Sequence, residues 1–231
     1  MQPKYQIQSY QEYQEKYKSS IENPEKFWEE VAEEFTWKKK WDSVCQWEFK
    51  TPDVKWFAGG KLNITENCLD RHLKTRGNKL AIIWEPNDPR DRAIRLTYRE
   101  LHEKVCQMAN LFKKYGIKKG DRVCLYMPMV PELAIAVLAI ARIGAIHSVV
   151  FAGFSAHALA DRINDAQCNM VITSDGINRG NKQIPAKRVV DEALKNCPSV
   201  KTVFVKDCCG WSPNMVEGRD FWLDAALEGM S

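Results

Sequence analysis

The chain has 231 residues, of which 45% are hydrophobic and 28% are charged, and its formal net charge is +4. This length is sufficient for one large domain with a buried core, or for a domain with an appendage. The small positive charge, with no basic stripe interleaved with aromatic residues, argues against a protein that binds nucleic acid.

The eight cysteines form no CxxC pair, and their one cluster is the adjacent Cys208 and Cys209. This spacing predicts neither a disulfide framework nor a zinc site, so we expect no bound metal ion. The first twenty residues are polar and lack the apolar stretch of a signal peptide. The longest apolar run, at 133–141, has nine residues, which is too short to cross a bilayer. We therefore expect a cytoplasmic protein with free thiols and no membrane association.

Residues 1–75 are predicted to form an amino-terminal cap segment, partly helical and partly irregular. The polar stretch 9–19 is a helix candidate, and Asn23 followed by Pro24 is typical of the start of a second helix. Residues 37–60 are rich in tryptophan and show no regular period, which predicts irregular structure.

The next segment contains a short helix and a pair of strands. Residues 67–74 are compatible with a short helix, and 80–85 and 93–97 with two strands joined by a turn-rich loop. Thr97 and Glu100 then form a capping-box pattern, which predicts the start of a long helix.

Residues 76–231 as a whole have the pattern of an α/β domain. Three short apolar runs alternate with two helical segments through short connections, which predicts successive crossover units and a parallel sheet. The strands are expected at 122–127, 146–151, 170–174 and 201–205, and the helices at 132–142, 156–166, 184–196 and 219–227. The predicted fold class is therefore α/β, with a mostly parallel sheet flanked by helices.

In such open sheets the ligand lies outside the carboxyl ends of the strands. The loops expected at that edge, which we call the rim, are 128–131, 151–155 and 175–184. The last of them contains Arg179 and Lys182 beside two glycines, a combination that can hold an anion such as phosphate. An ordinary solvated loop with surface cations is the competing interpretation.

No recognisable catalytic pattern accompanies this rim. The four histidines fall in helix or strand patterns, and none lies beside a serine or cysteine in a nucleophile elbow. Neither the G-x-x-x-x-G-K-[ST] phosphate loop nor the G-x-G-x-x-G fingerprint occurs. We therefore predict no catalytic residue in these 231 residues.

Two long stretches, WKKKWDSVCQWEFKTPDVKWFAGGKLNITENCLDRHL at 37–73 and 96–155 from LTYRELHEK to VVFAGFS, carry a family resemblance. They resemble the amino-terminal third of the acetyl-CoA synthetases, the AMP-forming acetate–CoA ligases of the adenylate-forming superfamily. The resemblance covers essentially the whole chain. It implies the amino-terminal subdomain of that fold, with acetate, Mg-ATP and CoA as small-molecule substrates of the complete enzyme and the remainder of the full-length chain as its partner.

The resemblance also implies a set of CoA-binding residues. Residues 179–182, RGNK, correspond to the family's CoA-binding loop, usually written R-x-G-R, and residues 151–153, FAG, to its F-G-G. The implied contacts are Arg179, Gly180, Asn181, Lys182, Phe151, Ala152 and Gly153. Lys182 replaces the usual arginine and keeps the charge without the bidentate fork, and Ala152 adds a methyl group where the family has glycine.

The family's ATP phosphate loop, T-S-G-S-T-G-x-P-K-G, does not occur in these residues. The resemblance therefore implies part of the CoA site without the adenylation machinery, and we expect the 231 residues alone to be inactive. Two alternatives remain open at this point. One is a non-catalytic module that binds CoA or a nucleotide, and the other is a flavodoxin-like or Rossmann-like domain of unrelated function.

Overall fold

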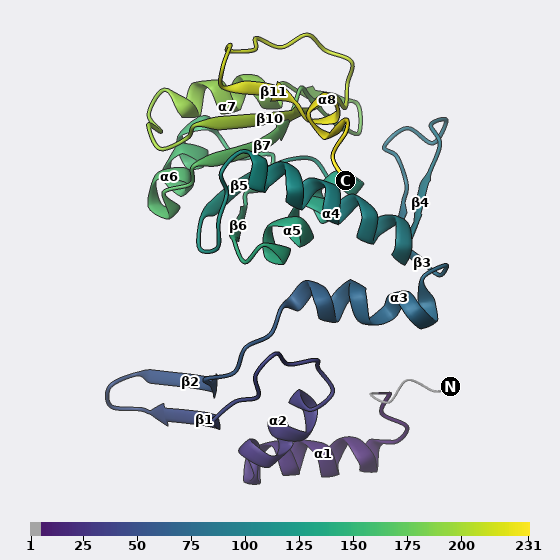
Figure 1. Ribbon diagram of the computed structural model, residues 1–231, viewed down its shortest axis with the longest axis vertical. Helices are drawn as coiled ribbons and strands as arrows, with labels where there is room; N and C mark the ends of the chain where they lie inside the picture. Colours follow the sequence, from purple (N-terminus) through teal and green to yellow (C-terminus); the bar gives the residue numbers. More distant parts are fainter. Residues whose placement is uncertain (1–5) are drawn as a thin grey trace. The chain divides into compact units, whose positions relative to one another are not determined.

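The computed structural model describes residues 6–231. The chain divides into two compact units, the first ending at Asn63 and the second beginning at Ile64, and each is described by itself (Figure 1). The predicted division into a cap segment, 1–75, and an α/β subdomain, 76–231, stays a prediction.

The first unit begins with two helices that start where the sequence predicts. Helix α1 (Tyr10–Glu22) follows Ser9, whose side chain accepts a hydrogen bond from the backbone N–H of Glu12. Helix α2 (Pro24–Ala32) has proline at its first position, where the missing N–H costs no helical hydrogen bond.

The tryptophan-rich segment, predicted to be irregular, contains an antiparallel hairpin of β1 (Ser43–Glu48) and β2 (Asp53–Ala58). The rings of Trp37, Trp41 and Phe57 lie 5.0–5.6 Å apart, centroid to centroid. Cross-strand pairing and these ring contacts order a segment whose aromatic residues follow no simple period.

The second unit is built on a five-stranded sheet in the order β11-β10-β7-β5-β6, with every neighbouring pair parallel (Figure 1). The strands are β5 (Arg122–Tyr126), β6 (Ile146–Val149), β7 (Met170–Ser174), β10 (Thr202–Lys206) and β11 (Asp220–Trp222). The predicted parallel α/β fold is thus confirmed, together with the order of strands and helices through its centre.

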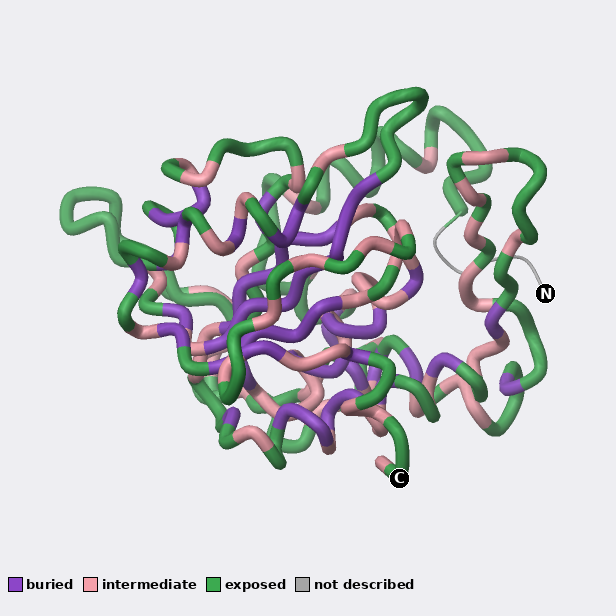
Figure 2. The backbone as a smooth tube through the Cα atoms, turned by 90° about the horizontal axis from the view of Figure 1, so that it is seen from above, coloured by how far each residue is buried: buried purple, intermediate pink, exposed green. Residues whose placement is uncertain are grey.

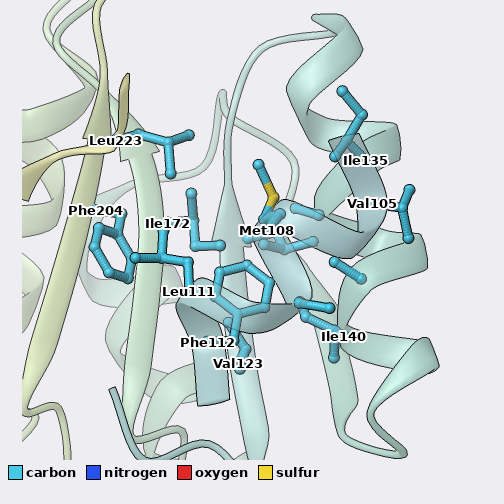
Figure 3. Packing of buried hydrophobic residues seen from close by; sticks show 14 of the residues in the cluster. Val105, Met108, Leu111, Phe112, Val123, Ile135, Ile140, Ile172, Phe204 and Leu223 are labelled. Atoms are coloured by element: carbon cyan, nitrogen blue, oxygen red, sulfur yellow. The ribbon is translucent and has the colours of Figure 1, made fainter. Parts of the chain in front are cut away.

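Helices cover both faces of this sheet. The helices are α4 (Tyr98–Lys114), α5 (Pro131–Arg142), α6 (Ala156–Ala166), α7 (Ala186–Leu194) and α8 (Leu223–Leu227). On one face, α4 and α5 pack on the side chains of Val123 and Leu125 (Figure 3). On the other face, α6 and α7 pack on Cys124 and Tyr126. This alternation along β5 places a core on each side, and the buried residues run through the central strands (Figure 2).

A shorter part of the second unit lies outside the main sheet. It consists of η1 (Glu66–Asp70), a π-helical turn, α3 (Arg71–Arg76), and the antiparallel pair β3 (Leu80–Trp84) and β4 (Ile94–Thr97). The capping box predicted at Thr97 and Glu100 is present and starts α4. The predicted helix and strand pair in this region are confirmed.

Three predicted elements differ from the structure. Strand β6 is not buried: it lies at the sheet edge, and Ile146 and Val149 are 54% and 52% exposed. Residues 175–184, predicted as a loop, contain the hairpin of β8 (Ile177–Arg179) and β9 (Lys182–Ile184). The predicted helix at 219–227 begins instead with strand β11, because residues 220–222 pair with β10 before α8 starts. Each difference depends on strand neighbours that a local pattern does not reveal.

Within the described residues, no helix is long and apolar enough to span a membrane. Among the same residues no group of histidine, cysteine and acidic side chains is arranged to hold a metal ion. All eight cysteines are free. Burial raises the pKa of the Cys168 thiol to about 11, in keeping with a structural rather than a reactive role.

Replacing Arg142 with methionine is expected to destabilise the fold by about 1–2 kcal/mol at neutral pH. Arg142 donates two hydrogen bonds to Asp70, of 2.8 and 2.9 Å, and so ties α5 to the π-helical turn. The hydrogen bonds from Arg142 lower the pKa of Asp70, an effect that partial burial of Asp70 opposes. The stabilisation is therefore present above the unfolded pKa of about 3.9 and is lost as the pH falls through the lower, folded value.

Urea denaturation at neutral and at acid pH measures this difference between wild type and R142M. Arg90→Met is the matched control, because Arg90 also pairs with an aspartate, Asp88, but is 88% exposed and should show no measurable change. A destabilisation by R142M that persists undiminished at acid pH would contradict the assignment to the Asp70 pair.

Candidate functional site

The strand order fixes where the rim lies. Because β5, β6 and β7 are parallel, the loops that follow them leave the same edge of the sheet. From β5 the chain crosses to β6 on one side, whereas from β7 it continues toward β10 on the other side. Ligands in open α/β sheets bind at such a switch point, outside the carboxyl ends of the strands. The candidate site is therefore at the ends of β5 and β7.

The first rim loop, after β6, is a tight turn built around two phenylalanines. The backbone N–H of Phe154 donates to the Phe151 carbonyl oxygen (3.0 Å), and the two rings meet edge to face with centroids 5.9 Å apart. The Tyr126 hydroxyl donates to the Phe154 carbonyl oxygen (2.9 Å), which ties the turn to the end of β5. The guanidinium of Arg162 lies 4.5 Å from the Phe154 ring. Phe154 is thus held on several sides, while Phe151 stays 58% exposed.

Gly153 allows the exposed ring to lie against the turn. A Cβ atom at Gly153 would lie 2.5 Å from Cε1 of Phe151, closer than the ring could tolerate. Ala152, between them, is half-buried and packs toward the core formed with α6 and α7. The methyl group that distinguishes this chain from the F-G-G pattern therefore packs against protein.

The second rim loop, after β7, is the β8–β9 hairpin. Its tip is the two-residue turn Gly180-Asn181, and Gly180 has φ +56°, as the first turn residue of a type II′ hairpin requires. Arg179 and Lys182 flank this turn as direct cross-strand partners. Their side chains share one face with Cβ atoms about 5 Å apart, and like charges in this arrangement repel each other. A bound anion would relieve that repulsion.

The base of the hairpin is fixed by Asp175, which is 1% exposed. Its carboxylate accepts hydrogen bonds from the backbone N–H groups of Cys208 (2.8 Å), Cys209 (3.1 Å) and Trp211 (2.8 Å). Its carbonyl oxygen accepts from the N–H of Lys187 at 3.4 Å, on the far side of the hairpin. Burial, followed by the negative charge of Asp175, raises the pKa of Cys208 to about 12. This aspartate therefore has a structural part at the edge of the site.

The two rim loops meet through Phe151 and Arg179. The guanidinium carbon of Arg179 lies 5.4 Å from the centroid of the Phe151 ring, within the range of a cation–π contact. Both residues are exposed, so their free surfaces face solvent together. An aromatic face beside two cations is suited to a ligand that combines a planar ring with phosphate groups.

The predicted site residues therefore fall into two groups, the turn 151–153 and the hairpin tip 179–182, joined by the Phe151–Arg179 contact. Sequence reasoning missed Asn87, in the loop between β3 and β4, whose side chain forms two hydrogen bonds with the backbone of Gly180. The turn-rich character of its loop was visible, but no local pattern relates it to a residue 93 positions away.

A buried ionic cluster lies directly beyond the hairpin. Lys187, in the first turn of α7, has no exposed side-chain surface, and its Nζ lies 2.7 Å from Asp191 and 2.8 Å from Asp220. It also donates to the Asn214 carbonyl oxygen (2.8 Å). Burial alone would raise the pKa of Asp220, but hydrogen bonds from Arg219 and Lys187 outweigh it and lower the pKa. The cluster joins α7 to the edge strand β11.

Comparison with known families divides the chain close to the boundary between the two units. Residues 13–68 match the model described as "Acetyl-coenzyme A synthetase N-terminus". Residues 69–223, most of the second unit, match the model described as "AMP-binding enzyme". The second match includes both rim loops and Asn87.

Curated proteins with similar sequences are acetyl-coenzyme A synthetases. The protein of Halorhodospira halophila is 52% identical over 219 residues, which cover 94% of this chain and 34% of the relative. Those of Alkalilimnicola ehrlichii and Pseudomonas aeruginosa, the latter called acetyl-coenzyme A synthetase 2, are each 51% identical and are likewise covered to 34%. The chain thus spans about a third of the length of these relatives.

A solved structure shows the same fold. Acetoacetyl-CoA synthetase from Streptomyces lividans matches with a TM-score of 0.83 over 93% of this chain and 32% of that chain, at 24% identity. Identity this low supports the fold alone, whereas the model match spans more than half of the 231 residues. The chain belongs to the family of AMP-binding enzymes.

Proposed function

We propose that this chain is the amino-terminal part of an acetate–CoA ligase. In the complete reaction acetate attacks the α-phosphate of Mg-ATP, and acetyl-adenylate and pyrophosphate form. The CoA thiol then displaces AMP, which gives acetyl-CoA. The acetyl-coenzyme A synthetases at 51–52% identity support this assignment, because their similarity extends over 94–95% of the chain.

Within that reaction, these residues supply part of the CoA site. The observation that carries this proposal is the contact between Arg179 and Phe151, which joins the two loops that resemble the family's CoA-binding motifs. CoA has a purine ring beside several phosphate groups. Phe151, lying over Gly153, offers the ring a flat surface, and Arg179 offers the phosphates a planar fork of donors.

Lys182, across the hairpin from Arg179, adds a second charge. It acts as a point charge and does not replace the bidentate arginine of the family pattern. Gly180 and Asn181 contribute the turn that brings the two cations together, and Ala152 supports the turn of Phe151 from below. The free thiols and the absence of a signal-like amino terminus support a cytoplasmic location as part of this proposal.

The 231 residues alone are expected to release no pyrophosphate from ATP in the presence of acetate. The reason is that they contain no glycine-, serine- and threonine-rich loop to bind the ATP phosphates. A coupled assay of pyrophosphate with the purified chain measures this, and a full-length acetyl-coenzyme A synthetase serves as the positive control. Acetate-dependent release above background would show that adenylation does not need that loop.

Titration with CoA tests the proposed site directly. Binding of CoA at millimolar or lower concentration, competed by adenosine 3′,5′-bisphosphate, is the expected result, because both ligands share the phosphates and the purine ring. Weak affinity is expected, since a site assembled from separate parts of a chain loses pre-organisation when one part is missing. CoA binding without any contribution to catalysis in a complementation assay with the remaining two thirds would favour a binding module instead.

A further inference from the structure

The loop between β3 and β4 reaches two of the rim loops. The indole N–H of Trp84 donates to the Met129 carbonyl oxygen at 2.7 Å, in the loop that follows β5. Farther along the same loop, Asn87 contacts Gly180, at the tip of the hairpin that follows β7. A segment outside the five-stranded sheet therefore touches the rim on both sides of the switch point.

The contact at Gly180 is a matched pair of hydrogen bonds. The backbone N–H of Gly180 donates to Oδ1 of Asn87 at 2.9 Å, and Nδ2 of Asn87 donates to the Gly180 carbonyl oxygen at 3.2 Å. A side-chain amide offers a donor and an acceptor in one plane, so it can satisfy both backbone groups of one residue as a neighbouring strand would. Asn87 thus extends the pairing of the hairpin beyond its own two strands.

The hairpin has reason to need this support. Each of its strands is three residues long, and a two-stranded hairpin of this size is marginal by itself. The last pair before the turn consists of two cations, Arg179 and Lys182, whose repulsion opposes closure of the tip. Fixing Gly180 between them holds both cations at one place on the rim.

We propose that Asn87 is a positioning residue of the CoA site: by pairing with the backbone of Gly180, it holds Arg179 and Lys182 where the phosphates bind. The inference rests on the proposed function, in which CoA is the anionic ligand. Asn87 acts through Gly180 and need not touch the ligand. The neighbouring Asp88 keeps the loop in shape, because its carboxylate accepts from the backbone N–H of Arg90 at 2.9 Å.

The test is a titration of the 231-residue chain with CoA, followed through the backbone amide signals by NMR, for the wild type and for N87A. We expect N87A to bind CoA about fivefold more weakly, as the loss of one or two hydrogen bonds implies, and its Gly180 amide to exchange faster without ligand. Asn178→Ala is the matched control. Asn178 accepts only from Gln183 on the same hairpin (3.1 Å) among its recorded side-chain bonds, so affinity and exchange should stay unchanged.

A double-mutant cycle separates positioning from a general loss of stability. If Asn87 positions Arg179, replacing Arg179 with alanine costs less affinity in the N87A background than in the wild type. Additive losses, or an N87A affinity within about twofold of the wild type, would overturn the inference. Wild-type chain that binds no CoA would contradict the proposed function and this inference with it, whereas binding that is indifferent to N87A contradicts this inference alone. Unchanged amide signals of β5 and β7 confirm that each variant is folded.

Discussion

CoA binding is expected to weaken by about tenfold or more when Arg179 is replaced by alanine. Arg179 has the planar group at the rim that can form paired hydrogen bonds with a phosphate, and charge-assisted bonds of this kind are among the strongest in proteins. It also lies 5.4 Å from the Phe151 ring, so its loss removes a contact between the two rim loops. R179K should fall between R179A and the wild type, because it keeps the charge and loses the fork.

Titration with CoA at two salt concentrations measures this effect, and the wild type should show the steeper loss of affinity with salt. Arg76→Ala is the matched control, since Arg76 is an exposed arginine at the end of α3 and its removal changes the net charge equally. An R179A variant that binds CoA as tightly as R76A would place the phosphates elsewhere.

Replacing Lys187 with methionine is expected to lower the free energy of unfolding by about 3 kcal/mol. The side chains of Lys187 and Asp220 are both fully buried and lie 2.8 Å apart. Methionine fills a similar volume but leaves Asp220 with one cationic partner, Arg219, in place of two. A buried carboxylate that loses a partner costs more than the pair itself contributes. The hydrogen bond to the Asn214 carbonyl oxygen is lost as well.

The shift of the urea midpoint at a constant m-value measures this loss. Lys195→Met is the matched control: Lys195 follows the last turn of the same helix and pairs with Glu192, but its side chain is 67% exposed, so no measurable change is expected. If both variants unfold at the wild-type midpoint, the buried cluster contributes no net stability and hydrophobic replacement compensates fully.

Much of the fold was predictable because local chemistry and tertiary structure agree in its centre. The capping box at Thr97, the proline at the start of α2 and the apolar runs of β5 and β7 each act within a few residues. The order of strands and helices then implied a parallel sheet. Where a residue's state depends on distant neighbours, the prediction was wrong: β6 is as apolar as a buried strand, yet it lies at the edge and is largely exposed.

The candidate site follows the same division. The positions of the rim loops followed from the parallel sheet, and the family resemblance pointed to Phe151 and Arg179 within them. Nothing in either motif indicated that the two side chains would meet, that Arg179 and Lys182 would be cross-strand partners, or that Asn87 would bond to Gly180. These relations join segments separated by up to 93 residues.

By itself, the sequence determined the α/β class, the helix starts, the family and the types of residue available at the rim, because each depends on short-range pattern or on long similarity. The tertiary structure decided which strand forms the edge, that 175–184 closes into a hairpin, and that a loop before the sheet supports its tip. Hydrogen bonds and charge contacts between distant segments form only once the backbone has brought them together, so no local signal in the chain records them.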